Sequence, residues 1–272
     1  MDVRTLLMAL ALFGYAAADS RAAVLYDGTS AVTPNGPPWA WAYQTFNKNN
    51  PLTTPSLATQ TPGPAAVTLN TTAESADVAG YLTHLPNLGT PGDAYLMPDL
   101  PLLDAAAGFE VQFSVRVASE SHVSADRAGF SVIALANDAA PLGIELGFWS
   151  NEIWAQTATF THDAVVNVAF DTTTTMVDYR LNVLGGGFTL WADGLQILSG
   201  ALRDYSAFSG GVPGNPGFPY DRPNLLFFGD NTSSAAATIE LARIAVVPEP
   251  ATHALACLAL LAMGVLRTRV QR

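Results

Sequence analysis

Short runs in which apolar and polar residues alternate predict β-strands over most of this chain. In the clearest run, from Phe109 to Val117, every second residue is apolar and the residues between are Glu, Gln, Ser and Arg. A period of two places the apolar side chains on one face of a strand and the polar ones on the other. Further strands are predicted at 129–136, 143–149, 152–157, 176–184, 187–192, 196–200, 225–228 and 236–246.

Glycine-rich and Asp-Gly turns separate several of these runs. Gly185-Gly186-Gly187 follows one run, and Asp193-Gly194 reverses the chain after the next. Asp-Gly is a strong hairpin signal because both residues accept the positive φ angles of a tight turn. No amphipathic helix pattern lies between the two ends of the chain. At least nine strands therefore predict an all-β fold, a β-sandwich or jelly roll, over residues 24–246.

Residues 28–64 form an arm that is rich in Pro, Asn and Thr, which predicts loop or loosely attached edge structure. Within this arm, Trp39, Trp41, Tyr43 and Phe46 alternate with small or polar residues. We expect these aromatic side chains to pin the arm onto the sandwich. The arm is also a candidate cover for one face of a sheet.

The first 18 residues have the order of features of a secretory signal peptide. Arg4 supplies a positive charge, Leu6–Phe13 is an apolar stretch, and Ala16 and Ala18 are small residues suited to a cleavage site. Cleavage after Ala18 or after Ala22 stays open. The sequence therefore predicts an exported protein with an N-terminal signal helix.

The C-terminal residues 247–272 combine three features in a fixed order. The motif Val247-Pro248-Glu249-Pro250-Ala251 comes first, and the uncharged stretch 254–266 follows it. Three cationic residues, Arg267, Arg269 and Arg272, then lie at the end of the chain. Two prolines interrupt strand or helix structure, so the motif separates the body from the tail.

A transmembrane helix over 251–268 is predicted from this uncharged stretch. The stretch has 13 residues, whereas a bilayer span usually takes about 20, so flanking residues complete the helix. Cationic residues at its far end keep the C-terminus in the cytoplasm and the body outside.

The order of motif, apolar helix and basic end resembles the PEP-CTERM sorting signal. This resemblance implies that exosortase recognises the tail in the inner membrane of a Gram-negative-type bacterium that makes extracellular polysaccharide. It also implies a membrane-anchored precursor and a mature protein at the cell surface or in the extracellular matrix. Whether the mature protein is released or attached stays open.

Charge limits the partners of the body. From Val24 to Pro250 there are six arginines and one lysine against 21 carboxylates, a net charge of −14. Such a surface repels phosphate backbones, which excludes nucleic acid as a partner. The one cysteine, Cys257, lies in the tail, so the body has no disulfide and no cysteine nucleophile.

The sequence holds weak signals for metal binding. The histidines lack the spacing of a zinc site. Asp230 and Asn231 follow a predicted strand and are weak candidates for Ca²⁺, which binds oxygen ligands. A turn in which these side chains cap the backbone is the favoured interpretation, so no cofactor is predicted.

Several segments of the body resemble the choice-of-anchor Y domain family, namely 119–135, 142–156, 160–174, 202–210 and 223–241. Members carry different anchoring tails on a shared extracellular sandwich, and no activity is assigned to the family. The hairpin ladder is also similar to that of concanavalin A-like lectins and glucanases, in Tyr179, Leu181, Val183, Phe188, Leu190 and Asp193-Gly194. These resemblances imply a concanavalin A-like sandwich and an extracellular location.

The segment 143–156 carries the candidate ligand site. A two-residue turn at Ser150-Asn151 would align the flanking strands so that Gly147 faces Trp154. One face then carries two indoles, two carboxylates and an amide: Glu145, Trp149, Glu152, Trp154 and Gln156. The other face is wholly apolar and is the predicted core face, with Ile144, Leu146, Phe148, Ile153 and Ala155. Flat aromatic surface beside hydrogen-bonding groups suits a sugar ring.

The two glutamates on this face do not have the spacing of a glycosidase pair. Retaining enzymes need carboxyl groups about 5 Å apart, and inverting enzymes about 6.5–9.5 Å. In the predicted register Glu145 and Glu152 lie four residues apart along the strands, roughly 13 Å. A secreted glycan-active hydrolase is therefore the alternative only if one glutamate partners a carboxylate elsewhere, such as Glu110 or Asp126. The sequence favours a non-catalytic, structural or carbohydrate-associated sandwich, with extracellular polysaccharide as candidate partner.

A second cluster of polar residues is expected around one loop. Glu120, His122, Asp126 and Arg127 lie close together in the sequence, and His162-Asp163 is expected to approach them in a sandwich. Ion pairs within the loop are the favoured interpretation over a binding site.

Overall fold

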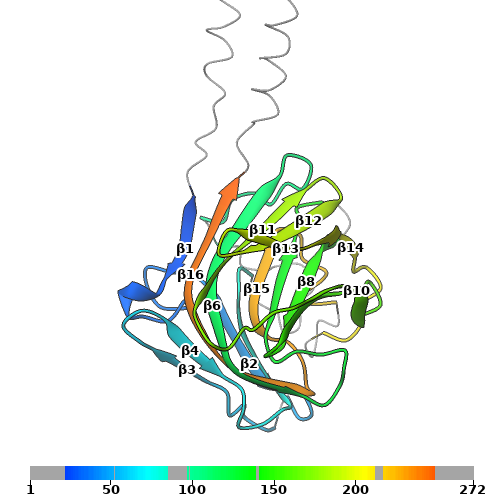
Figure 1. The fold of residues 1–272 in the computed structure, drawn as a ribbon. Coiled ribbons are helices and arrows are strands. Elements are labelled where there is room, and N and C mark those ends of the chain that lie inside the picture. Colours follow the sequence, from blue (N-terminus) through cyan, green and yellow to red (C-terminus); the bar gives the residue numbers. More distant parts are fainter. Residues whose placement is uncertain are drawn as a thin grey trace, which may run out of the picture.

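The computed structural model describes residues 22–51, 53–84, 97, 99–138, 141–211 and 217–248. These residues form two antiparallel sheets that pack face to face (Figure 1). They contain one short 3₁₀ helix, η1 (Gly28–Ser30), and no α-helix. The predicted all-β, two-sheet sandwich is thus confirmed. Within the described ranges no helix is long and apolar enough to cross a membrane, and the predicted signal and transmembrane helices lie outside these ranges.

Sheet A is built around two 14-residue strands, β6 (Phe109–His122) and β16 (Ala235–Pro248), which pair along their length. On the far side of β6 follow β11 (Val177–Leu184), β12 (Gly187–Ala192) and β13 (Leu195–Ala201). On the far side of β16 lie β4 (Val67–Asn70) and β3 (Thr59–Pro62), and β1 (Ala23–Asp27) also pairs with β16.

Sheet B has the order β10-β9-β8-β7-β15-β5-β2, and β14 pairs with β8 at one end. Its strands are β10 (His162–Ala169), β9 (Glu152–Gln156), β8 (Leu142–Phe148), β7 (Ser131–Leu135), β15 (Leu225–Asp230), β5 (Asp77–Leu82), β2 (Ala42–Asn47) and β14 (Arg203–Asp204).

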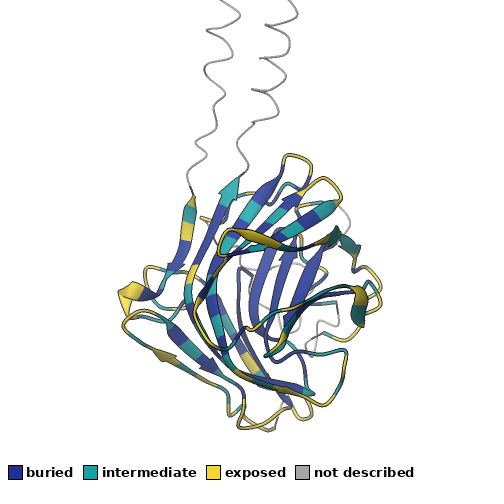
Figure 2. Ribbon diagram, viewed as in Figure 1, coloured by how far each residue is buried: buried dark blue, intermediate teal, exposed yellow. Residues whose placement is uncertain are grey.

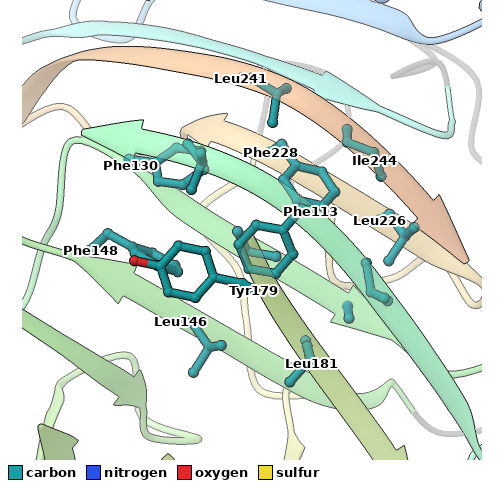
Figure 3. Packing of buried hydrophobic residues seen from close by; sticks show 14 of the residues in the cluster. Phe113, Phe130, Leu146, Phe148, Tyr179, Leu181, Leu226, Phe228, Leu241 and Ile244 are labelled. Atoms are coloured by element: carbon teal, nitrogen blue, oxygen red, sulfur yellow. The ribbon is translucent and has the colours of Figure 1, made fainter. Parts of the chain in front are cut away.

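The main core lies between the two sheets. Phe113 of β6 stacks on Tyr179 of β11 with ring centroids 5.1 Å apart, and it meets Phe148 and Phe228 of sheet B edge to face (Figure 3). The predicted inward face of 109–117 is confirmed, because Phe109, Val111, Phe113, Val115 and Val117 are all buried.

A second apolar cluster lies on the outer face of sheet B. Sheet B side chains such as Ile133, Leu135 and Phe227 contact Tyr205, Phe218 and Tyr220 there. These three residues belong to what we call the covering segment, residues 203–211 and 217–222. The central strands of sheet B are therefore buried on both faces (Figure 2). Burial on both faces explains why their sequences are continuous apolar runs, whereas strands of sheet A alternate.

All nine predicted strands are present, but the arm 28–64 contains regular structure that its composition did not predict. It supplies an edge strand to each sheet, β2 to sheet B and β3 to sheet A. The arm is pinned as expected: Trp41 is buried, and its Nε1 donates to the carbonyl of Leu25 at 2.8 Å. Trp39 packs edge to face on Tyr26.

Both ends of the sandwich emerge at the same edge. Ala23 of β1 pairs with Val246 of β16, so the two strands lie side by side (Figure 1). β16 continues two residues past the predicted boundary, since Val247 pairs with Glu110 and Pro248 with Phe109. Proline is tolerated there because a strand end needs no further ladder hydrogen bond. The remaining motif residues, Glu249, Pro250 and Ala251, and the arginines of the tail lie outside the described residues.

Candidate functional site

The hairpin of β8 and β9 has the predicted register. Gly147 pairs with Trp154, Phe148 pairs with Ile153, and the Trp149 N–H donates to the Glu152 carbonyl at 2.9 Å. The apolar face points into the main core as expected. Gly147 is needed at its position, because a Cβ there would lie 2.5 Å from the indole of Trp154.

The opposite face does not form the open aromatic platform that the sequence pattern indicates. Glu145, Trp154 and Gln156 are only 2%, 1% and 4% exposed. Trp149 and Glu152 are half-buried. The arm 28–64 does not provide the cover for Glu145 and Gln156; the covering segment does, through Tyr205 and Tyr220.

Trp149 is held in a stack of rings at the end of this hairpin. The imidazole of His122 stacks on it at 4.2 Å and 10°, and that of His162 at 5.1 Å and 18°. Its Nε1 donates to the carbonyl of Arg127 at 2.7 Å. The indole of Trp149 thus packs against two imidazoles of the protein itself. Its N–H links the hairpin to the loop that contains Arg127.

The expected polar cluster forms in part: Glu120 and His122 lie at the end of β6 rather than in a loop, and Asp163 pairs with Arg203 instead. His122 Nδ1 lies 3.1 Å from Glu120, and His162 Nε2 lies 2.6 Å from Glu152. The His162 N–H donates to Asp126 at 2.9 Å. Each of these groups therefore has a hydrogen-bond partner inside the cluster.

Glu145 lies at the centre of a buried hydrogen-bond network. Its carboxylate accepts from the Tyr220 hydroxyl and from Asn231 Nδ2, the latter at 3.1 Å, and its N–H donates to the Tyr205 hydroxyl at 3.0 Å. Burial raises the pKa of Glu145, although these donors and the charge of Arg127 oppose the shift. Burial also raises the pKa of Tyr220 well above its ordinary value.

Asp230 and Asn231 do not converge on a common point. Asp230 is buried and accepts from the Thr71 hydroxyl at 2.8 Å and from the Thr232 N–H at 3.0 Å, which caps the turn. Asn231 turns toward Glu145 instead. Over the described ranges, no group of three His, Cys, Asp or Glu side chains has a geometry that could hold a metal ion.

A pocket lies beside this network, on the outer face of sheet B. Its cavity volume is about 70 Å³, and its walls come from β2, β5, β9, β15, four loops and the covering segment. Its lining includes three half-buried phenylalanines, three amides and two cations: Phe46, Phe160, Phe208, Gln44, Gln156, Asn231, Lys48 and Arg127.

The sequence analysis singled out Gln156, Asn231 and Arg127 of this pocket, but not as one site. Gln44, Phe46 and Lys48 come from the arm, more than 70 residues before Arg127. The one local signal was Lys48, since it is the only lysine of the chain. Nothing in the sequence pattern indicated that it faces Arg127 across the outer face of sheet B.

No protein-family model and no curated protein matches this chain. Among solved structures it is similar to a carbohydrate esterase from the Shiga toxin-encoding bacteriophage phi24B, at 14% identity over 75% of this chain and 89% of that chain, with a TM-score of 0.43. It is similar to the binding domain of botulinum neurotoxin DC in complex with SialylT, at 9% identity over 77% of this chain and 43% of that chain, with a TM-score of 0.38. It is also similar to alginate lyase A1-II′, at 10% identity over 63% of this chain and 80% of that chain, with a TM-score of 0.33. At these identities and TM-scores, the similarities assign the chain neither a family nor an activity.

Proposed function

We propose that this chain is an exported protein of the cell surface or extracellular matrix, with a concanavalin A-like sandwich that binds carbohydrate without cleaving it. The observation that carries the binding role is the pocket on the outer face of sheet B. Its phenylalanine rings come from separate elements, Phe46 from β2, Phe160 from a turn and Phe208 from the covering segment. Aromatic surface of this kind packs against the C–H face of a sugar.

Amide groups beside these rings supply hydrogen bonds of the kind that sugar hydroxyls need. Asn231 lines the pocket and donates to Glu145 through Nδ2, and within the described ranges its Oδ1 accepts no hydrogen bond. Gln156 contacts the Tyr220 hydroxyl with Oε1 at 3.5 Å, and its Nε2 has no hydrogen bond to a described residue. An amide both donates and accepts, so this set matches hydroxyl groups.

The positions of the carboxylates support a non-catalytic role. Glu145 is buried beneath Tyr220, and Glu152 pairs with His162. Of the two carboxylates considered as partners, Glu110 lies beside Arg180 on sheet A rather than sheet B, and Asp126 accepts from the His162 N–H. The described pocket lining therefore contains no pair of free carboxylates at the spacing that glycoside hydrolysis requires.

Delivery to the cell surface is the part of the proposal that rests on the two ends of the sequence. A leader over 1–18 and a tail over 247–272 have the order of features of export and sorting signals. The described residues are compatible with such processing, because β1 and β16 pair side by side at one edge of the sandwich.

The binding role is tested with Phe208→Ala. We expect the full chain to be retarded in affinity electrophoresis by at least one polysaccharide from a panel of neutral and acidic polymers. Loss of one aromatic wall should weaken that binding about tenfold. Phe208 is half-buried on the surface of the covering segment, so thermal unfolding should shift only slightly.

The matched control is Trp191→Ala, which removes an aromatic ring from the outer face of sheet A, beneath Arg180. It should leave the retardation unchanged. Equal binding by the Phe208 variant and the wild type, or no binding to any polymer, contradicts the proposal. The same panel is assayed for reducing-sugar release, and we expect none.

A further inference from the structure

The pocket on the outer face of sheet B contains two cations of a chain that has few. Only seven Lys and Arg residues lie between Val24 and Pro250. Four of these arginines lie within 4.0 Å of a carboxylate oxygen: Arg116, Arg180, Arg203 and Arg222. Lys48, Arg127 and Arg243 have no such partner among the described residues, and of these three Lys48 and Arg127 line the pocket.

Arg127 is fixed in place by hydrogen bonds that involve only Nη1 of its guanidinium group. Its Nη1 donates to the carbonyls of Asp126 and Phe160, each at 2.6 Å. Its Nε and Nη2 donate to no described residue. This pair of N–H groups is the planar fork that binds a carboxylate through two parallel hydrogen bonds. Because the side chain is already fixed, binding would cost little conformational entropy.

Lys48 adds a second positive charge to the same pocket. It is exposed overall, yet the pocket walls displace part of its hydration and, together with the charge of Arg127, lower its pKa. Two like charges near one another repel, and an anion placed between them removes that cost. Glu145 and Asp230 act in the opposite direction on the pKa of Lys48, but burial and Arg127 outweigh them, and the Glu145 oxygens accept from Tyr220 and Asn231 rather than from either cation.

The size of the pocket limits what enters it. A cavity of about 70 Å³ has room for roughly two water molecules at liquid density. It therefore admits a carboxylate and the adjoining edge of a sugar ring, while the rest of the ring lies against Phe46 and Phe208 at the surface.

We propose that this pocket recognises acidic sugars, of the uronic acid class, through Arg127 and Lys48. Arg127 pairs with the sugar carboxylate, Lys48 provides a second cation, and the amides bond to ring hydroxyls. This inference rests on the proposed carbohydrate-binding function and names its ligand class. The net charge of −14 of the body repels polyanions, so binding of an acidic sugar depends on the two cations of the pocket.

The probe is polygalacturonate, and its matched neutral form is the same polymer after reduction of the carboxylates to alcohols. The full chain should bind polygalacturonate at least about tenfold more tightly than the reduced polymer. Lys48→Gln and Arg127→Gln should each remove most of that difference. The control Arg243→Gln changes an exposed arginine of β16 in sheet A and should leave both affinities unchanged.

The outcomes separate this inference from the function on which it rests. Equal binding of both polymers would overturn acidic-sugar recognition and leave carbohydrate binding standing. Binding to no polysaccharide would overturn both. Lys48→Gln alters an exposed side chain, so its result stays decisive if Arg127→Gln unfolds the loop. A wild-type preference for polygalacturonate that persists in both variants would place the acidic-sugar site elsewhere and overturn the assignment to this pocket.

Discussion

At the scale of single residues, the carboxyl groups of Glu145 and Asp230 are buried away from water. A carboxylate removed from water loses hydration that only hydrogen bonds restore. Glu145 recovers part of it from Tyr220 and Asn231, and Asp230 from Thr71 and Thr232. These bonds hold the floor of the pocket in one arrangement, and the raised pKa of both carboxyls shows that they do not offset burial completely.

Asp230→Asn should make stability less dependent on pH. Burial raises the pKa of Asp230 well above its ordinary value, and the charges of Glu120 and Asp77 add to this. The folded state therefore binds the proton more tightly than the unfolded state. The stability that this group contributes is complete below the unfolded pKa of about 3.9 and is lost as pH rises toward the folded pKa.

Urea unfolding of the purified protein at several pH values between 4 and 8 measures this effect. The wild type should lose free energy of unfolding across that range, at about 1.4 kcal/mol for each unit of pKa elevation, and Asp230→Asn should lose less. Asp204→Asn is the control, because Asp204 is exposed and the Ser206 N–H lowers its pKa. Identical pH dependence in the wild type and Asp230→Asn would show that burial of Asp230 carries no such cost.

At the scale of elements, the hairpins of sheet A are specified by their turns. Asp193 and Gly194 both have positive φ, 47° and 84°, and connect Ala192 to Leu195. The Asp193 carboxylate also accepts from the N–H of Asp178 at 3.0 Å, which ties the turn to β11. Such backbone angles suit glycine and aspartate, so the local sequence alone determines the reversal.

Gly194→Ala should destabilise the protein by about 1 kcal/mol through its backbone angle alone. A Cβ at this position would meet nothing within 4 Å, so no steric contact contributes. Gly186→Ala is the matched control: that glycine has equally open space and does not have a positive φ. Its free energy of unfolding should stay within about 0.5 kcal/mol of the wild type. Equal effects of the two substitutions in urea unfolding would contradict this account.

At the scale of the whole molecule, the two ends of the sandwich and its pocket lie on different parts of the structure. Ala23 and Val246 pair at the edge where β16 ends, whereas the pocket lies on the outer face of sheet B. Under the proposed function, an anchor beyond β16 would leave the binding face free. The proposed sorting motif begins inside the last strand, since Val247 and Pro248 still pair with β6.

Replacing Pro248-Glu249-Pro250 with alanines should leave the precursor bound to the membrane and unprocessed, because the motif is the proposed recognition element for exosortase. Membrane fractionation and the mass of the mature protein in the native host measure this. Glu249→Ala alone is the companion variant, because it leaves Pro248 of β16 unchanged. Normal maturation of both variants would contradict recognition of the motif.

The sequence by itself determined five strands of sheet A (β6, β11, β12, β13 and β16), the turns between β11, β12 and β13, and the register of the β8–β9 hairpin. These features depend on side-chain alternation and on turn residues, which are local. The edge strands in the arm were missed, because β3 has mostly exposed side chains and prolines surround both β2 and β3. β10 was missed for a related reason, since its residues are exposed or half-buried throughout.

Only the tertiary structure decided which face of sheet B meets solvent. Alternation along 143–156 separates two faces, but it does not say what covers each of them. The covering segment has no period of its own, and it buries Glu145 and Gln156 beneath Tyr205 and Tyr220. The same packing brings Lys48 and Arg127 to one pocket from separate parts of the chain. Such a site depends on long-range contacts, which short-range patterns do not encode.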